Sequence, residues 1–132
     1  MPKPTKEDAD LILKLFSTAI NDELYQEASR WFFIDFNETN FDKFIKENPL
    51  GSQGYRYFSR VVTYAELVST FVVAEVLSED LVYDMWGDME WKKAEPIVKG
   101  LRTQFGIPRL YENFEVVAKK YPEWAENHPP KV

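Results

Sequence analysis

The 132-residue sequence has no cysteine and a single histidine, His128. A chain without cysteine forms no disulfide, no thiolate metal site and no cysteine nucleophile, and this composition suits a reducing compartment. A Ser-His-Asp triad, a multi-histidine zinc site and the Glu-x-x-His pairs of di-iron bundles all need histidines that packed elements hold in place. His128 instead lies in "NHPP", where a solvated side chain is expected, so these chemistries are excluded.

The sequence also lacks the signatures of membrane-spanning, secreted and phosphate-binding segments. No apolar run approaches the roughly 20 residues that span a bilayer, and the opening "MPKPTKEDAD" is polar where a signal peptide needs an apolar stretch. Neither G-x-x-x-x-G-K-[ST] nor G-x-G-x-x-G occurs, which excludes the usual phosphate-binding loops. A soluble, cytoplasmic protein is therefore expected.

Basic residues are too few for a polyanion-binding surface. The formal net charge is −6, from 22 acidic and 16 basic residues, and the acidic excess is present in both halves of the chain. Nucleic acids and anionic membranes bind clustered Lys and Arg, so neither is expected as a partner. Hydrophobic residues make up 45% and aromatic residues 16% of the chain, which is ample for one core. The length predicts a single domain over residues 1–132.

Glycine and proline are absent from residues 5 to 48, which predicts a long helical N-terminal part. Thr5 and Asp8 form a capping-box pattern, so a helix should begin near Lys6. Residues 6–36 form either one long helix or two, with Asn21-Asp22 as the weakest point. After the break "NETN", Thr39 with Asp42 should cap a short helix that ends before "NPLGSQG". The predicted buried stripe of the first segment is Ala9, Ile12, Leu13, Phe16, Ile20, Leu24, Ala28 and Phe32.

The second half of the chain predicts four more helical segments with helical spacing of apolar residues. A helix over 55–77 precedes a short one that Ser78 starts and Gly87 ends. Asp88 should cap the next helix, which contains Trp91 to Phe105 and has Pro96 inside it. Pro122 should end the last helix, leaving a flexible tail from about residue 125. The fold class is therefore all-α, a compact bundle of five or six helices with a long N-terminal helix or helix pair.

The stretch "VLSEDLVYDMWGDMEW" concentrates acidic residues without a single Lys or Arg. Asp80 and Asp84 are four residues apart, so on a helix they share one face and are close enough to share a cation such as Mg²⁺. The paired-glutamate spacing of all-helical pyrophosphohydrolases is absent, however, and acidic residues also stabilise helix starts. Two hypotheses remain for this acidic cluster: a metal site or a pair of helix starts. In a metal site, Glu66, Glu75 or Glu95 on a neighbouring helix would be the facing carboxylate. The cluster consists of Glu79, Asp80, Asp84, Asp88 and Glu90.

Three further patterns have an ordinary structural interpretation beside a functional one. The segment Asp35–Glu47 begins like a calcium loop, but Asn40 replaces the essential Gly and Lys46 the bidentate Glu, so a helix break is favoured. The basic group Lys99, Arg102 and Arg109 is either an anion site or a solvated face. An aromatic-lined pocket or a set of core anchors accounts for the four tryptophans, Trp31, Trp86, Trp91 and Trp124.

The second half of the chain resembles a family of small bacterial all-helical proteins classed as a domain of unknown function. The residues that carry the resemblance, mainly over 55–124, are "YRYFSRV", "LSEDLVYDMWG", the segment from Trp91 through "EPIVKGLR", and "YENFEVVAKKYPEW". The resemblance implies an all-helical fold and a bacterial or phage origin, and it implies no reaction.

The sequence thus favours a protein-interaction or regulatory module without catalysis, with a protein partner or self-association. The alternative is an acidic, metal-dependent hydrolase of small phosphorylated compounds that uses Asp80, Asp84 and a facing glutamate. No residue is assigned a catalytic, cofactor-binding or metal-binding role, and no cofactor is expected. Trp86 is predicted to be buried where the two short-linked helices meet, because Met85, Trp86 and Met89 flank the turn.

Overall fold

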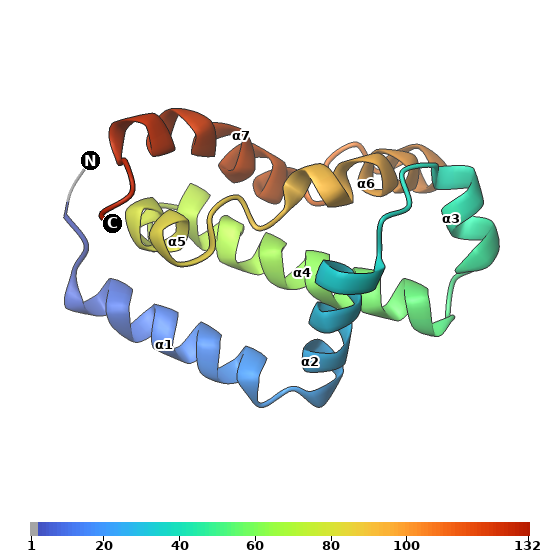
Figure 1. The fold of residues 1–132 in the computed structure, drawn as a ribbon, viewed down its shortest axis with the longest axis horizontal. Coiled ribbons are helices and arrows are strands. Elements are labelled where there is room, and N and C mark those ends of the chain that lie inside the picture. Colours follow the sequence, from blue (N-terminus) through green and yellow to red (C-terminus); the bar gives the residue numbers. More distant parts are fainter. Residues whose placement is uncertain (1–2) are drawn as a thin grey trace.

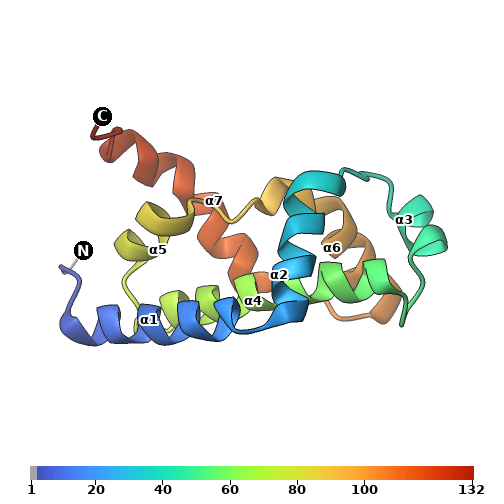
Figure 2. The same ribbon diagram turned by 60° about the horizontal axis from the view of Figure 1, so that its bottom comes forward.

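The computed structural model describes residues 3–132, which form seven α-helices and one π-helical turn and no strand (Figures 1 and 2). The all-α class is confirmed, but the helix count of five or six was too low because the N-terminal segment breaks into separate helices. The elements are α1 Lys6–Ile20, α2 Glu23–Arg30, the π-helical turn η1 Trp31–Asp35, α3 Phe41–Glu47, α4 Gln53–Val73, α5 Glu79–Trp86, α6 Trp91–Phe105 and α7 Glu112–Asn127.

The N-terminal segment is a pair of helices, broken at the Asn21-Asp22 step as expected. The Asp22 carboxylate accepts a hydrogen bond of 3.0 Å from the backbone N–H of Tyr25 and so starts α2. The predicted capping box at Thr5 is also present. The Asp8 carboxylate additionally accepts the backbone N–H of Ser78 at 2.9 Å, which ties the start of α1 to the start of α5.

The π-helical turn after α2 was not predicted. The backbone N–H of Phe36 donates to the carbonyl of Trp31 at 2.8 Å, five residues back, so the turn is wider than an α-helical one. Phe32 and Phe36 both reach the core from this turn, with ring centroids 5.6 Å apart. Residue spacing alone does not distinguish a π turn from an α turn, which is why the sequence did not reveal it.

Two caps differ from the predicted ones. Asn40, and not Thr39, is the N-cap of α3, and its side chain accepts from Lys43 N–H at 2.9 Å. The Asp88 carboxylate accepts the N–H of Glu90 at 3.0 Å, inside the turn that precedes α6, so it does not cap that helix. The residue at the N-cap position of α6 is Glu90, whose backbone is left-handed with φ 59° and whose side chain makes no capping bond.

Two helices end elsewhere than predicted. The helix α4 ends at Val73, because Glu75 adopts a left-handed conformation with φ 62° that turns the chain, and Val76 is consequently exposed. The helix α7 continues through Pro122 to Asn127, where an end at Pro122 was expected. Trp124, beyond the proline, packs on Tyr83 and Tyr121 at centroid distances of 5.3 and 5.9 Å, and these contacts favour continuation of the helix.

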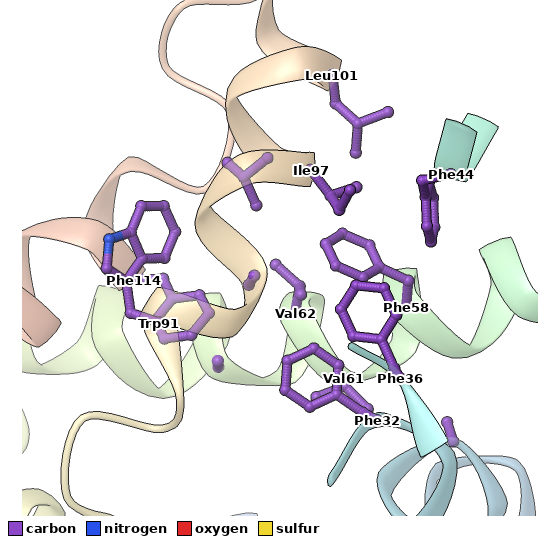
Figure 3. Packing of buried hydrophobic residues seen from close by; sticks show 14 of the residues in the cluster. Phe32, Phe36, Phe44, Phe58, Val61, Val62, Trp91, Ile97, Leu101 and Phe114 are labelled. Atoms are coloured by element: carbon purple, nitrogen blue, oxygen red, sulfur yellow. The ribbon is translucent and has the colours of Figure 1, made fainter. Parts of the chain in front are cut away.

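Figure 1 shows α4 between α7 on one side and α1 and α2 on the other. The helix contributes residues to both buried clusters. The large core joins α2, η1, α3, α4, α6 and α7 and is rich in phenylalanine (Figure 3). Gly100 lets the Phe41 ring of α3 approach α6, because a Cβ at this glycine would lie 2.1 Å from the ring. The small core, between α1, α4, α5 and α7, contains Leu15, Val68, Val72, Leu77, Val82, Tyr83 and Val117.

Candidate interaction surface

The helix α1 carries two apolar faces, and only one of them is buried. Leu15 is buried in the small core, and Ala19 is buried as well. Leu13, Phe16 and Ile20 are 64%, 42% and 52% exposed. The predicted stripe is therefore wrong in this helix, because the sequence pattern does not indicate which of two adjoining apolar faces is covered. We call the exposed residues Ala9, Leu13, Phe16 and Ile20 the α1 stripe.

A cavity of about 230 Å³ opens beside the α1 stripe. Its lining comes from α1, α2, α4 and α5, so it lies where the N-terminal helix pair meets the rest of the molecule. The lining residues are Phe16, Ala19, Ile20, Tyr25, Gln26, Tyr64 and Trp86.

The two tyrosines of this cavity are uncharged hydrogen-bonding groups. The Tyr64 hydroxyl donates to the backbone carbonyl of Leu15 at 2.8 Å, which fastens α1 to α4. Burial raises the pKa of Tyr64 to about 12, and burial also raises the pKa of Tyr25. Their rings lie 4.9 Å apart. Because both groups stay neutral near pH 7, the cavity offers an apolar, aromatic environment.

Trp86 lines the cavity and is half-buried, so its predicted full burial is wrong. The turn after α5 is covered by Met89, which packs against both cores and takes the place expected for the indole. A half-buried ring that faces a cavity gains less from packing than a core ring does.

We therefore expect Trp86→Ala to lower the free energy of unfolding by about 1–2 kcal/mol, against about 3–5 kcal/mol for the matched core change Trp91→Ala. Trp91 is buried and its ring meets that of Phe114 edge-on at 5.0 Å. Urea unfolding of both variants measures the difference, and equal losses would show that Trp86 is a core residue.

The acidic cluster does not gather into one site. Asp80 accepts the indole N–H of Trp124 at 2.8 Å, and Asp84 pairs with Lys131 at 3.1 Å. Asp88 shapes the turn before α6 as described above. Glu79 lies in the first turn of α5, as the helix-start hypothesis predicts.

The three candidate facing carboxylates have separate structural roles. Glu66 on α4 accepts the backbone N–H of Phe114 at 2.8 Å and the Asn113 amide at 3.0 Å, so it caps α7 from a neighbouring helix. Glu95 accepts the indole N–H of Trp91 at 3.1 Å, and Glu75 ends α4. Among residues 3–132, no group of three or more His, Asp or Glu side chains is placed to hold a metal ion. The arrangement that the hydrolase alternative requires is therefore not found in this part of the chain.

The basic group is made of separate ion pairs. Lys99 pairs with Glu95 at 3.4 Å and Arg102 with Glu115 at 2.7 Å. Arg109 pairs with Glu112 at 2.8 Å. Each of these charges has an acidic neighbour, which favours separate ion pairs over a shared anion site.

The four tryptophans do not meet in one pocket. Trp91 is a core anchor, and Trp31 stacks on Phe36 at 4.9 Å. Trp86 lines the cavity beside α1, whereas Trp124 lies between α5 and α7. The surface of interest is thus the α1 stripe with its cavity. The sequence analysis predicted that most of these residues belong to the core. The 4-3-4 spacing of residues 9, 13, 16 and 20 indicates that they share one helix face.

None of the helices formed by residues 3–132 combines the length and the apolarity needed to cross a bilayer.

A family model described as a domain of unknown function, DUF4760, matches residues 4–121. The match includes the N-terminal helix pair, which lies outside the resemblance noted over 55–124, and it confirms that the family is an uncharacterised one. No curated protein and no solved structure matches the chain.

Proposed function

The chain belongs to the DUF4760 family of domains of unknown function, and we propose from its geometry that it is a protein-interaction module whose α1 stripe binds a basic amphipathic helix of another protein. The observation that carries this proposal is the exposure of Leu13, Phe16 and Ile20 along one face of a helix whose adjoining apolar face is already packed.

The spacing of the α1 stripe supports a helical partner. Residues 9, 13, 16 and 20 follow intervals of four, three and four, which is the alternation that keeps an apolar seam facing a second helix. The seam from residue 9 to residue 20 is about 16 Å long, enough for three turns of a partner helix. Helix-in-groove recognition uses anchors at this spacing.

The cavity beside the stripe supports an anchor side chain of the partner. Its volume of about 230 Å³ lies below the roughly 300–1,000 Å³ of pockets that hold small molecules. One large apolar side chain of a docked helix would fill such a space, as buried anchors do in protein interfaces. Trp86 and Tyr64 would form its aromatic walls.

Charge supports a basic partner over a second copy. The chain has a formal net charge of −6. Two copies of it therefore repel each other, whereas a cationic helix is attracted. Asp10 on α1 and Glu23 at the start of α2 are exposed. A partner with Lys or Arg on either side of its apolar seam meets these acids at the rim.

The test uses an 18-residue synthetic helix with Leu at 4-3-4 spacing and Lys on both flanks. We expect saturable binding in isothermal titration calorimetry, at least about tenfold tighter than for the same peptide with Glu flanks. Leu13→Ser with Ile20→Ser should abolish binding while leaving the unfolding midpoint nearly unchanged, because both side chains are exposed. The matched control is Ile34→Ser, which removes an apolar side chain that is 71% exposed elsewhere.

Retained binding by the Leu13→Ser, Ile20→Ser chain would contradict the proposal, as would equal affinity for the Lys-flanked and Glu-flanked peptides. Sedimentation equilibrium of the parent chain tests whether a second copy of the chain covers the α1 stripe instead. A dimer that the double substitution dissociates would replace the foreign helix with a second copy.

No observation favours the hydrolase alternative, since the carboxylates it needs are engaged in separate helix caps and side-chain contacts. We also propose that the chain is one domain, because α4, α7 and Met89 contribute to both cores. The expected absence of nucleic-acid binding rests on the acidic charge, and the expected mobility of the tail from about residue 125 stays a prediction.

A further inference from the structure

A second surface, separate from the α1 stripe, lies between α5 and α7. Its floor is a group of packed aromatic rings. Tyr83 lies tilted against Tyr121 at 5.5 Å and against Trp124 at 5.3 Å, and Tyr121 stacks on Trp124 at 5.9 Å. Tyr83 is buried and its hydroxyl donates to the Val117 carbonyl at 2.6 Å, which fixes the floor to α7.

Acidic side chains border this floor on α5. Asp80 accepts the indole N–H of Trp124 at 2.8 Å, so the carboxylate orients the ring. Asp84, one helical turn further along, is on the same helix face. A cavity of about 570 Å³ lies over this floor, and its lining includes Asp80, Asp84, Tyr121 and Trp124.

The chain's own residues after α7 fold back over the same surface. Figure 1 shows the segment turning from the end of α7 toward α5. The His128 ring stacks on Trp124 at 4.2 Å with the planes 10° apart. Pro129 and Pro130 line the cavity, and Lys131 Nζ lies 3.1 and 3.2 Å from the two oxygens of Asp84.

Each part of this segment matches a feature of the groove. Consecutive prolines favour the extended polyproline conformation, and such segments bind to grooves lined by aromatic side chains. Lys131, which follows the prolines, pairs with the Asp84 carboxylate at the edge of the groove. We propose that the α5–α7 groove binds extended, proline-rich segments of another protein that carry a Lys or Arg next to the prolines, and that residues 128–131, which border it in the same chain, act as a competing ligand.

The intramolecular contact is weak enough to be displaced. The side chains of Lys131 and Asp84 are 80% and 56% exposed, and exposed ion pairs contribute little because water and salt screen them. Pro129 and Pro130 are exposed as well. The chain's own segment nevertheless has the advantage of being tethered, since a linked ligand competes at a high local concentration.

The test uses the full chain, labelled with ¹⁵N, and the acetylated and amidated peptide Asn-His-Pro-Pro-Lys-Val, which copies residues 127–132. The readout is the indole N–H signal of Trp124, identified by its loss in Trp124→Phe. We expect saturable shifts of this signal in Lys131→Ser, with an affinity up to about fivefold higher than in the parent, because the internal competitor is weakened by the loss of one exposed ion pair. The matched control Lys120→Ser removes another exposed lysine of α7 and should bind like the parent.

Three outcomes would overturn the proposal. The first is equal binding of a peptide with both prolines changed to alanine and the lysine to glutamate. The second is an absence of saturable shifts in Lys131→Ser at millimolar peptide. The third is a Trp124 shift that depends on protein concentration alone, which would assign the groove to the tail of a second copy. Leu13→Ser with Ile20→Ser should not alter peptide binding, so failure of this proposal and failure of the helix-binding one are distinguishable.

Discussion

Phe58→Ala should lower the free energy of unfolding by about 3–5 kcal/mol and the melting midpoint by about 10–20 °C. The ring is fully buried in the large core, and its centroid lies 5.4 Å from Phe44, 5.7 Å from Phe36 and 6.2 Å from Phe32 (Figure 3). Its removal takes away the partner of three rings that come from η1 and α3. The surrounding helices are held by several further side chains, so the space cannot close fully.

The matched control is Phe33→Ala, since Phe33 belongs to the same π-helical turn as Phe32 but is exposed. We expect a loss below about 1 kcal/mol there. Urea unfolding followed by circular dichroism measures both variants. A loss for Phe58→Ala no larger than that for Phe33→Ala would mean that the large core does not hold η1 and α3 on α4.

The sequence predicted the all-α class and the helix caps at Thr5 and Ser78 because their signals are local. A cap such as Ser78 acts within three residues of its own position, and the capping box at Thr5 is equally short-range. The stripe of α4 was also correct up to Val72, because a helix in the middle of a bundle buries its apolar face from end to end.

The errors share a different cause, which is dependence on distant residues. Glu66 caps α7 across 48 positions of sequence, and no spacing rule relates them. Trp124 draws α7 past Pro122 through contacts with α5. The exposure of the α1 stripe likewise depends on which face of α1 the small core covers. The sequence pattern therefore indicated that the residues of the α1 stripe share a helix face, but not that this face is exposed.

The pair Arg102–Glu115 is the second position where a large loss is expected. Arg102 Nη1 lies 2.7 Å from Glu115, Arg102 Nε donates to the Leu110 carbonyl at 2.8 Å, and the two side chains are only 16% and 17% exposed. The guanidinium also lies over the Trp91 ring at 5.9 Å. Glu115→Gln leaves this cation without its carboxylate, and we expect a loss of about 2–3 kcal/mol at pH 7.

The matched control lies on the same helix. Glu112 forms an exposed pair with Arg109, so Glu112→Gln should cost between about 0 and 1 kcal/mol. Urea unfolding at pH 7 compares the two. Equal losses would show that the partial burial of Arg102 does not strengthen its pair.

The same pair predicts how acid destabilises the protein. The hydrogen bond from Lys119, together with the hydrogen bond and charge of Arg102, lowers the pKa of Glu115 in the folded state. Because the folded-state pKa is the lower one, the carboxylate's contribution is complete above the unfolded-state pKa, about 4.3. It is lost as the pH falls through the folded-state pKa, because protonation removes the negative charge that pairs with Arg102.

The stability difference between the parent and Glu115→Gln should therefore shrink from pH 7 to pH 3, as measured by urea unfolding at both values. A difference that stays constant over this range would mean that the glutamine variant is destabilised by altered packing and not by loss of the charge.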